Sequence, residues 1–261
     1  MEVITVANNK GGVGKTMQCY QLACYLANKG KRVLVIDLDS QANLSSTFEV
    51  NIQRTLIPEW LIGDVGYEEV LVPSSGEGEF HKNITLIPAS RHLANLSKLL
   101  ILSENEIRKN AGRKERLLKI RLDEIRSKNL FDFVVIDTPP MLGDELIMAV
   151  VVANKLLVPT QAQDYSIDGL EELMDTVEII RETENPTMSF SIIPSMVNMR
   201  RKIERQRLDE LSQMFNITPA IRNLVQAQES ISLKKPVFTF GERCRSKTDY
   251  DALWDNLHLS Q

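Results

Sequence analysis

Short apolar runs alternate along the chain with longer segments whose apolar residues follow a helical period. The runs are rich in β-branched residues and lie at 3–7, 32–36, 84–87, 133–136, 155–158 and 189–193. Runs of this length that are apolar throughout are typical of strands buried on both faces, and strands that alternate with helices form parallel sheets. The pattern predicts an α/β fold, with a mostly parallel sheet that carries helices on both faces.

Two segments of helical period can be placed in more detail. In the first, apolar side chains recur three and four positions apart, at Cys19, Leu22, Ala23, Leu26 and Ala27. This spacing predicts one amphipathic helix, and Gly30 stands where a C-terminal cap is expected. The second segment, 91–129, is too long for one typical helix, and Asn110-Ala111-Gly112 offers a break into two. Residues 73–78, rich in serine and glycine, are expected to form a surface loop.

Composition limits the class of protein. With 261 residues, 43% of them hydrophobic, the chain suits one domain over 1–261 that buries its core without metals or disulfides. No apolar run approaches the roughly 20 residues of a membrane-spanning helix, and the N-terminus lacks a secretory signal, so we expect a cytoplasmic protein. The three cysteines have neither disulfide nor zinc spacing, and no metal site is expected on them.

The charge is unevenly distributed. The net charge is −4, from 31 Lys and Arg against 35 Asp and Glu. Between residues 198 and 247, however, 11 basic residues stand against 5 acidic ones, which gives +6 and leaves 20 against 30, or −10, for the remainder. Such asymmetry permits an anion-binding face on an acidic protein. The segment richest in basic residues, 200–207, fits either a solvated helix face with ordinary ion pairs or an anion-binding patch.

The strongest chemical signal is the segment NKGGVGKT, residues 9–16, directly between the first predicted strand and the first predicted helix. In this position glycines let the backbone turn its N–H groups toward phosphate oxygens, and the helix N-terminus adds partial positive charge. Lys15 is expected to contact the β- and γ-phosphates of ATP, and the Thr16 hydroxyl to ligate Mg²⁺. The expected nucleotide-binding residues are Lys10, Gly11, Gly12, Val13, Gly14, Lys15 and Thr16. A glycine-rich turn with incidental lysines fits this context and spacing poorly.

Two aspartates follow predicted strands. Asp39 lies in the segment IDLDSQ after the second strand, and Asp137 in VVIDTPP after the fourth. Because ligands of open α/β sheets bind at the carboxyl ends of the strands, both carboxylates can act on a bound phosphate group. We expect Asp137 on the magnesium side, acting through water, and Asp39 to orient or deprotonate the attacking water. The expected metal-side residues are Thr16, Asp39 and Asp137. For either aspartate taken alone, the alternative is that its side chain only caps the turn after the strand.

The segments KGGVGKT, DLDSQ and VVIDTPP occur in the order and approximate spacing of the ParA/MinD group of deviant-Walker ATPases. The sequence closely resembles this group, and within it the ParA partition proteins, along essentially the whole chain. Further matches are Gly112-Arg113, Gly169-Leu170 and Lys235-Pro236-Val237. The chain departs from the common pattern at Asn9, where glycine is usual, at Ser40, where proline is usual, and at Gln163, where many relatives carry glutamate.

The resemblance implies a P-loop ATPase that forms a homodimer with ATP. In the family, the lysine at the position of Lys10 reaches across the dimer to the partner's phosphates, so Lys10 joins Lys15 and Asp39 as a catalytic residue. The dimer would bind double-stranded DNA of the nucleoid without sequence preference, and a ParB-like centromere-binding partner would stimulate its slow hydrolysis of ATP. Because the chain begins at its P-loop strand, we do not expect the N-terminal helix-turn-helix with which some relatives bind operators.

DNA contacts are expected where the basic segment and the resemblance coincide. Arg222-Asn223 matches the R-N segment of the family, whose arginine belongs to the DNA-contacting surface, and Arg200 and Arg201 begin the basic run. With few aromatic residues among them, phosphate contact on a duplex is favoured over stacking on unpaired bases. The expected DNA-binding residues are Arg200, Arg201 and Arg222.

Other classes of function make different demands on the sequence. A MinD-like membrane-cycling ATPase needs a C-terminal amphipathic helix with a basic polar face. Residues 249–261 contain Leu253, Trp254, Leu257 and Leu259 but no lysine or arginine, so core packing and no membrane contact are expected. An iron-sulfur reductase on this P-loop would need paired cysteine ligands, which the chain does not supply. A relative that positions another cargo, such as a receptor array, remains an open alternative.

Overall fold

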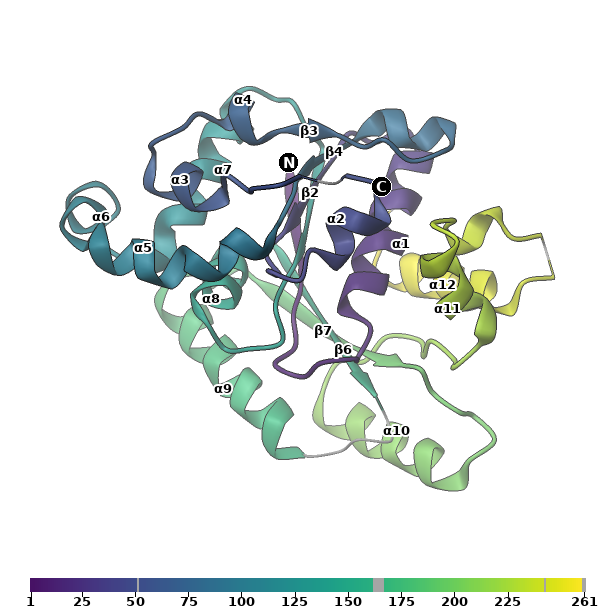
Figure 1. Ribbon diagram of the computed structural model, residues 1–261. Helices are drawn as coiled ribbons and strands as arrows, with labels where there is room; N and C mark the ends of the chain where they lie inside the picture. The colour runs from purple at the N-terminus through teal and green to yellow at the C-terminus, as the bar shows by residue number, and fades with distance from the viewer. Residues whose placement is uncertain (51, 162–166, 242, 260–261) are drawn as a thin grey trace.

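The computed structural model of the chain describes residues 1–50, 52–161, 167–241 and 243–259. Its centre is a sheet of seven strands in the order β3-β4-β2-β5-β1-β6-β7 (Figure 1). The strands are β1 (Glu2–Val6), β2 (Val33–Asp37), β3 (Val72–Pro73), β4 (Ile84–Ile87), β5 (Phe133–Asp137), β6 (Lys155–Gln161) and β7 (Ser189–Ser195). Neighbouring strands run parallel except for β3 and β4. The predicted α/β fold with a mostly parallel sheet is confirmed.

All six predicted strands are present, and their ends differ from the prediction by at most three residues. The prediction missed β3, which pairs antiparallel with β4 at the edge of the sheet and overlaps the segment 73–78 that was expected to be a loop. Two residues are too few to show an alternating pattern. Pro73 has no N–H to donate, and an edge position tolerates it.

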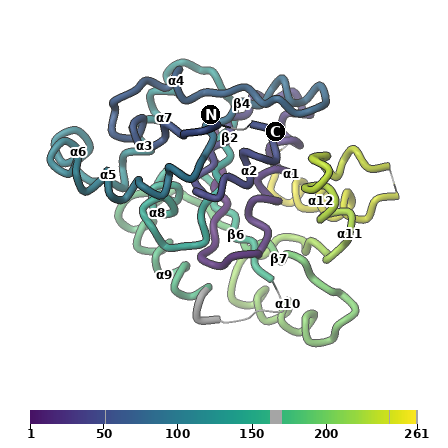
Figure 2. The backbone as a smooth tube through the Cα atoms, in the orientation of Figure 1, coloured from purple at the N-terminus to yellow at the C-terminus, as the bar shows by residue number. Residues whose placement is uncertain are grey.

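Helices cover both faces of the sheet (Figure 1 and Figure 2). One face carries α1 (Lys15–Asn28), α2 (Asn43–Thr47), α11 (Val225–Ser232) and α12 (Arg245–Asn256). The other carries α3 (Ile57–Ile62), α4 (Tyr67–Val70), α5 (Leu96–Leu102), α6 (Glu104–Asn110), α7 (Leu117–Ser127), α8 (Asp144–Val151) and α9 (Ile167–Thr183), and α10 (Lys202–Met214) packs through Leu211 beside α9. Short 3-10 helices are η1 (Glu79–Asn83), η2 (Arg91–Asn95), η3 (Lys114–Arg116) and η4 (Val237–Thr239). Adjacent residues of β1 show the division, because Ile4 packs in the core under α1 and Val3 in the core of the opposite face.

The predicted helix after the first strand is α1, but its burial exceeds the prediction. Eleven of its 14 residues are buried, Gln18 and Gln21 among them. The cause is that α1 is enclosed between the sheet and the C-terminal helices, so it has no broad solvent face. Its predicted cap is confirmed, because Gly30 has a φ of 77° and its N–H donates to the Ala27 carbonyl at 2.9 Å.

The region 91–129 divides into more pieces than the two helices predicted. The predicted break is present at Gly112, whose φ is 75°. A second break at Ser103 separates α5 from α6, and the parts before and after Gly112 each begin with a 3-10 turn. As a result α5 and α6 form a bent arm at one side of the molecule (Figure 2).

The C-terminal apolar residues lie in the core, as predicted. Leu253, Trp254, Leu257 and Leu259 are each at most 4% exposed, and the Trp254 ring lies 5.8 Å from the ring of Tyr25 on α1. Within the described ranges, no helix is both long and apolar enough to cross a bilayer. The packing of α12 on α1 fixes the C-terminal helices against the face of the sheet that α1 covers. The loop between β1 and α1 leads into this face.

Candidate nucleotide-binding site

The phosphate-loop candidate connects β1 to α1, and α1 begins at Lys15. Gly12 and Gly14 have φ angles of 75° and 98°, a left-handed conformation that costs other residues about 1–2 kcal/mol. A side chain at Gly12 would meet no atom within 4 Å, so the backbone angle, and not the space, requires glycine there. A curled glycine backbone followed directly by a helix N-terminus is the geometry that binds phosphate.

The end of β6 holds this loop in place. Asn8 Nδ2 donates to the Pro159 carbonyl at 2.8 Å, and its Oδ1 accepts from the Lys10 N–H at 2.9 Å. Gln161 Nε2 donates to the Gly12 carbonyl at 2.6 Å. Because both supports come from the same strand, contacts within the chain fix the curved form of the loop, which lowers the entropy cost of binding a ligand.

The ammonium group of Lys15 lies inside the loop. It donates to the Lys10 carbonyl at 2.8 Å, and the residue is only 7% exposed. Burial lowers the pKa of Lys15, while the carboxylates of Asp137 and Asp39 oppose that shift. A triphosphate would bring further negative charge to this partly desolvated cation, which strengthens the hydrogen bonds between them.

The carboxylate of Asp137 forms the floor of the site. Thr16 Oγ1 donates to its Oδ2 at 2.7 Å, while its Oδ1 is buried and has no hydrogen-bond partner. Burial, together with the charge of Asp37, raises the pKa of Asp137 to about 8. A buried carboxylate with an unused oxygen beside a hydroxyl fits a hydrated divalent cation, which would compensate the charge. Among the described residues, including those of this cleft, no group of three or more His, Cys, Asp or Glu side chains could hold a metal ion by itself.

Asp37 has a role that the sequence analysis did not assign. It lies opposite Asp137 in the register of β2 and β5 and is fully buried. Its Oδ2 accepts from the N–H and the hydroxyl of Ser45 at 2.9 and 2.7 Å, and its Oδ1 accepts from the Asp39 N–H at 3.1 Å. Asp37 therefore anchors the segment that carries Asp39. A charged residue that ends an apolar strand, as in VLVID, was the available signal.

Asp39 lies at the rim of the cleft and is partly buried. Its Oδ1 accepts from the Gln41 N–H at 2.9 Å, which is the turn-capping bond named as the alternative to a catalytic role. Asp39 therefore caps a turn and also lies in the cleft. Ser40, the departure from the family pattern, follows Asp39 in the same turn, whereas Gln163 lies outside the described residues.

A cleft of about 660 Å³ opens above the loop. Its walls come from the loop and from four further segments, with the residues Gly11, Gly12, Gly14, Lys15, Thr16, Met17, Asp39, Gln41, Asn43, Ser46, Thr47, Pro140, Met196, Gln228, Ile231 and Lys234. Such a volume suits a nucleotide. The wall from α11 was not predicted, because no motif spacing links residues so far apart in sequence.

Two glycines of the phosphate loop and neighbouring apolar residues form an exposed surface. Gly11 and Gly12 are exposed, and a side chain on Gly11 would lie 4.0 Å from Pro140. Met141 is 69% exposed. Lys10 is half-buried at the edge of this surface, and its reach across a dimer stays a prediction.

The predicted DNA-binding residues lie near one another. Val197 forms a parallel bridge with Arg222, and the exposed Arg200 and Arg201 precede α10. The Arg222 side chain is engaged with Asp249, with Nη2 to Oδ1 at 2.6 Å, and is 34% exposed. Arg222 therefore fixes its segment to α12, and contact of the three arginines with DNA stays a prediction.

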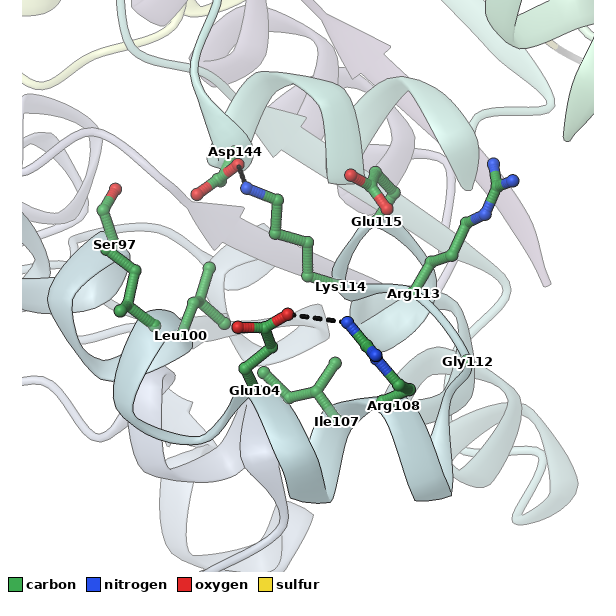
Figure 3. Close-up of a pocket in the computed structure, with 11 residues that line it drawn as sticks. Ser97, Leu100, Glu104, Ile107, Arg108, Gly112, Arg113, Lys114, Glu115 and Asp144 are labelled. Atoms are coloured by element: carbon green, nitrogen blue, oxygen red, sulfur yellow. Dashed lines mark hydrogen bonds and ion pairs between the residues drawn. The ribbon is translucent and has the colours of Figure 1, made fainter.

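A second cavity, of about 480 Å³, lies between α5, α6, η3 and the start of α8 (Figure 3). Two ion pairs form among its charged side chains, Lys114 with Asp144 at 2.8 Å and Arg108 with Glu104 at 2.9 Å. None of the phosphate-loop residues lines it. The nucleotide cleft is therefore the better candidate for the functional site.

Comparison with known proteins agrees with the geometry. The AAA domain family matches residues 1–190. The chromosome partitioning protein ParA of Caulobacter vibrioides is 29% identical over 256 residues, which are 96% of this chain and 91% of that protein. The crystal structure of a putative plasmid partition protein from Borrelia burgdorferi bound to AMPPNP aligns with a TM-score of 0.77 and 23% identity over 98% of both chains. Cobyrinic acid a,c-diamide synthase from Mycobacterium smegmatis, with bound ADP and magnesium, aligns with a TM-score of 0.74 and 26% identity over 89% of this chain and 93% of that one.

Replacement of Lys15 tests the phosphate loop. In Lys15→Ala, ATP affinity should fall at least about tenfold, and about a hundredfold if the ammonium group bonds two phosphate oxygens, because charge-assisted hydrogen bonds are removed. Calorimetric titration with ATP measures the change. Lys29→Ala is the matched control, since Lys29 is exposed at the other end of α1. Unchanged affinity in Lys15→Ala would mean that the loop is not the phosphate site.

Two substitutions of Asp39 separate its two contacts. Asp39→Ala should keep ATP bound while turnover falls about 100-fold or more, because a water-orienting carboxylate acts mainly in the transition state. Asp39→Asn keeps an oxygen that can cap the Gln41 N–H but loses the charge, and it should be as slow as Asp39→Ala. Phosphate release at saturating ATP measures both. Full turnover in Asp39→Asn would reduce Asp39 to a turn cap.

Proposed function

Because the chain belongs to the AAA domain family and is a ParA-type member of it, we propose that it is a DNA-partitioning ATPase, which converts ATP and water to ADP and phosphate. One observation carries the proposal: a phosphate loop with two lysines adjoins Thr16, whose hydroxyl donates to the buried carboxylate of Asp137. ATP and Mg²⁺ are the cofactors that this arrangement fits. The similarity to the chromosome partitioning protein ParA extends over 96% of the chain, and so includes the basic C-terminal part.

Each residue of the site has a chemical task in this proposal. The loop N–H groups and Lys15 bind the β- and γ-phosphates and hold the γ-phosphorus in line with a water molecule. Bound Mg²⁺ supplies charge neutralisation at the phosphates, and Thr16 and Asp137 would hold it. Asp39 orients the water and accepts its proton while the bond from the γ-phosphorus to ADP breaks. Because Asp39 is partly exposed and already caps a turn, hydrolysis is slow until a partner completes the site.

ATP drives dimerisation in this proposal. The surface of Gly11, Gly12, Pro140 and Met141 lets a second chain approach the phosphates closely, and burial of Met141 on association would stabilise the dimer. The triphosphate alone would leave excess negative charge between two chains. Lys10, at the edge of this surface, supplies the cation that compensates it across the interface.

The dimer binds duplex DNA through two copies of the surface around Arg200, Arg201 and Arg222. Phosphate contacts carry little sequence information, so binding is nonspecific and strongly salt-dependent. A ParB-like centromere-binding protein stimulates hydrolysis, which dissolves the dimer and releases DNA, and this cycle places the protein on the nucleoid within the cytoplasm. A membrane-cycling role has no support from α12, since its apolar side chains are already buried in the core.

Lys10 is the residue whose replacement separates dimerisation from ATP binding. Lys10→Ala should weaken the ATP-dependent dimer about tenfold or more, because it removes a charge-assisted hydrogen bond from the interface, while the monomer still binds ATP. Light scattering with ATP and with ADP, over a range of protein concentrations, measures the dimer. If the variant dimerises with ATP as the wild type does, Lys10 contacts only its own loop.

Salt titration tests the DNA surface. The variant with Arg200→Ala and Arg201→Ala should bind DNA more weakly and flatten the plot of log affinity against log salt by about one unit for each DNA phosphate that the variant no longer neutralises. Arg222 is less suitable, because its removal also unpairs the buried Asp249. Arg126→Ala is the control, since Arg126 is 44% exposed on α7 at the other face of the sheet.

Two unrelated duplexes and both nucleotides complete the design. Equal binding with ATP and ADP would contradict the nucleotide switch. A strong preference for one duplex would contradict nonspecific binding, and an unchanged slope in the double variant would remove Arg200 and Arg201 from the DNA surface.

A further inference from the structure

Two helices that are far apart in the sequence contribute walls to the nucleotide cleft. Asn43, Ser46 and Thr47 come from α2, and Gln228 and Ile231 come from α11. A nucleotide in the cleft therefore lies between an early and a late segment of the chain. The separation of α2 from α11 then controls how easily a nucleotide enters and leaves.

Both helices end in a Schellman motif, in which the residue after the cap takes a left-handed backbone conformation and is usually glycine. That residue is Glu49 after α2, with a φ of 61°, and Lys234 after α11, with a φ of 52°. The N–H groups of Glu49 and Val50 donate to the carbonyls of Ser46 and Ser45, and those of Lys234 and Lys235 to the carbonyls of Ile231 and Ser230, at 2.9 to 3.1 Å. Because a side chain strains this conformation, a contact made by that side chain has to offset the strain.

The two left-handed residues pair with each other. Lys234 Nζ donates to Glu49 Oε1 at 3.0 Å, and the two side chains are 44% and 38% exposed. Since the Schellman motifs fix both backbones, this ion pair joins the C-terminal ends of α2 and α11 directly.

Helix α1 supports both ends of this connection. The ring of Phe48, next to Glu49, lies 5.0 Å from the ring of Tyr20 on α1. On the other side, Gln21 Nε2 of α1 donates to Ser230 Oγ of α11 at 2.7 Å. The contacts thus form a closed ring, from α1 through α2 and the ion pair to α11 and back to α1, and the exposed ion pair is its outermost member.

The ion pair lies between the nucleotide cleft and a neighbouring cavity of about 700 Å³. Glu49, Phe80 and Phe240 are among the residues that line this cavity. Lys234 lines both the cavity and the cleft. Movement of Lys234 away from Glu49 would therefore join the two spaces and open one side of the cleft.

We propose that Glu49 and Lys234 are a gating pair, which closes one side of the nucleotide cleft and sets the rate of nucleotide exchange. An exposed ion pair is favoured only about two- to fivefold over its broken form, so the pair slows exchange without preventing it. Release of product is often the slow step of a nucleotide cycle, and ADP has to leave before ATP can bind. The proposal rests on the proposed function only in that the cleft binds a nucleotide, and it requires neither dimerisation nor DNA.

Glu49→Gln and Lys234→Met remove the charges and keep side chains of similar length. Either substitution should speed both the release and the entry of ADP about two- to fivefold, while the Kd of ADP stays at the wild-type value. Both rates rise together because the pair can close before and after the nucleotide has entered. The double variant should be no faster than either single variant, since all three lack the same contact. Stopped-flow fluorescence with Mg²⁺ and an ADP analogue labelled on the ribose measures the rates, and calorimetry with ADP measures the Kd.

Exchange of the two charges is the rescue. The variant with Glu49→Lys and Lys234→Glu restores an ion pair and should return both rates toward the wild-type values. Glu49→Lys alone places two ammonium groups together and should be at least as fast as Lys234→Met. Lys119→Met is the matched control, because Lys119 pairs with Asp123 on α7 at 2.7 Å with 54% and 42% exposure, and it should leave both rates unchanged.

Lys234→Gly separates gating from a merely structural role. Glycine relieves the left-handed strain, so the unfolding midpoint should not fall, yet ADP exchange should be as fast as in Lys234→Met. If the ion pair only held the fold together, Lys234→Gly would leave the exchange rates at the wild-type values.

Three other results would overturn the proposal. One is an unchanged pair of rates in Glu49→Gln and Lys234→Met, and another is an additive effect in the double variant. The third is faster release with unchanged entry and a raised Kd, which would mean that Lys234 bonds the nucleotide itself. All three presuppose that ADP binds to the wild type. If calorimetry shows that the wild type binds neither ADP nor ATP, nucleotide binding in the proposed function fails, and the gating pair fails with it.

Discussion

The structure around the cleft depends on the burial of two carboxylates at the ends of adjacent parallel strands. Asp37 and Asp137 face each other in the register of β2 and β5, and neither is more than 1% exposed. Loss of hydration on burial raises the pKa of Asp37 to about 6 and that of Asp137 to about 8, and the charge of Asp37 adds to the rise at Asp137. The arrangement becomes favourable only if donors and cations surround it. Ser45 satisfies Asp37, and Thr16 together with the charge of Lys15 partly satisfies Asp137. The remaining demand at Asp137 is for positive charge, which is why this point of the sheet suits a nucleotide that carries a cation.

The sequence predicts the half of the site that lies in contiguous segments. Lys15 and Thr16 follow a strand and begin a helix, so local geometry alone places them in the candidate phosphate loop, and Asp137 ends an apolar run of the kind that forms a central strand. Gln228 and Ile231 complete the opposite wall from α11, more than 200 residues along the chain from the loop. Tertiary packing brings them there, and a single sequence carries no periodic signal for it. The same limit applies to α1, where Gln18 and Gln21 read as a polar face although their partners, far along the chain, bury them.

The number of basic residues in the C-terminal part overstates how many of them can contact DNA phosphates. Of the basic residues there, Arg222 is paired with Asp249, Lys234 with Glu49 at 3.0 Å, and Lys247 with Asp251 at 3.0 Å. Such pairs lower the positive potential of the surface even where each is worth little in stability. Arg200 and Arg201, which precede α10, are both exposed, and Arg201 also pairs with Glu204 at 3.4 Å. A single patch of this kind binds a duplex weakly, so the affinity of the proposed complex must come from two patches held together, and control of dimerisation is then control of DNA binding.

The polar residues inside the core of α1 fit the same logic. Apolar side chains at Gln18 and Gln21 would fill the core without the cost of desolvating amides, and buried polar groups are often no better for stability than well-packed apolar ones. Gln21 offsets that cost with two hydrogen bonds, and it specifies how α11 and η4 pack on the helix.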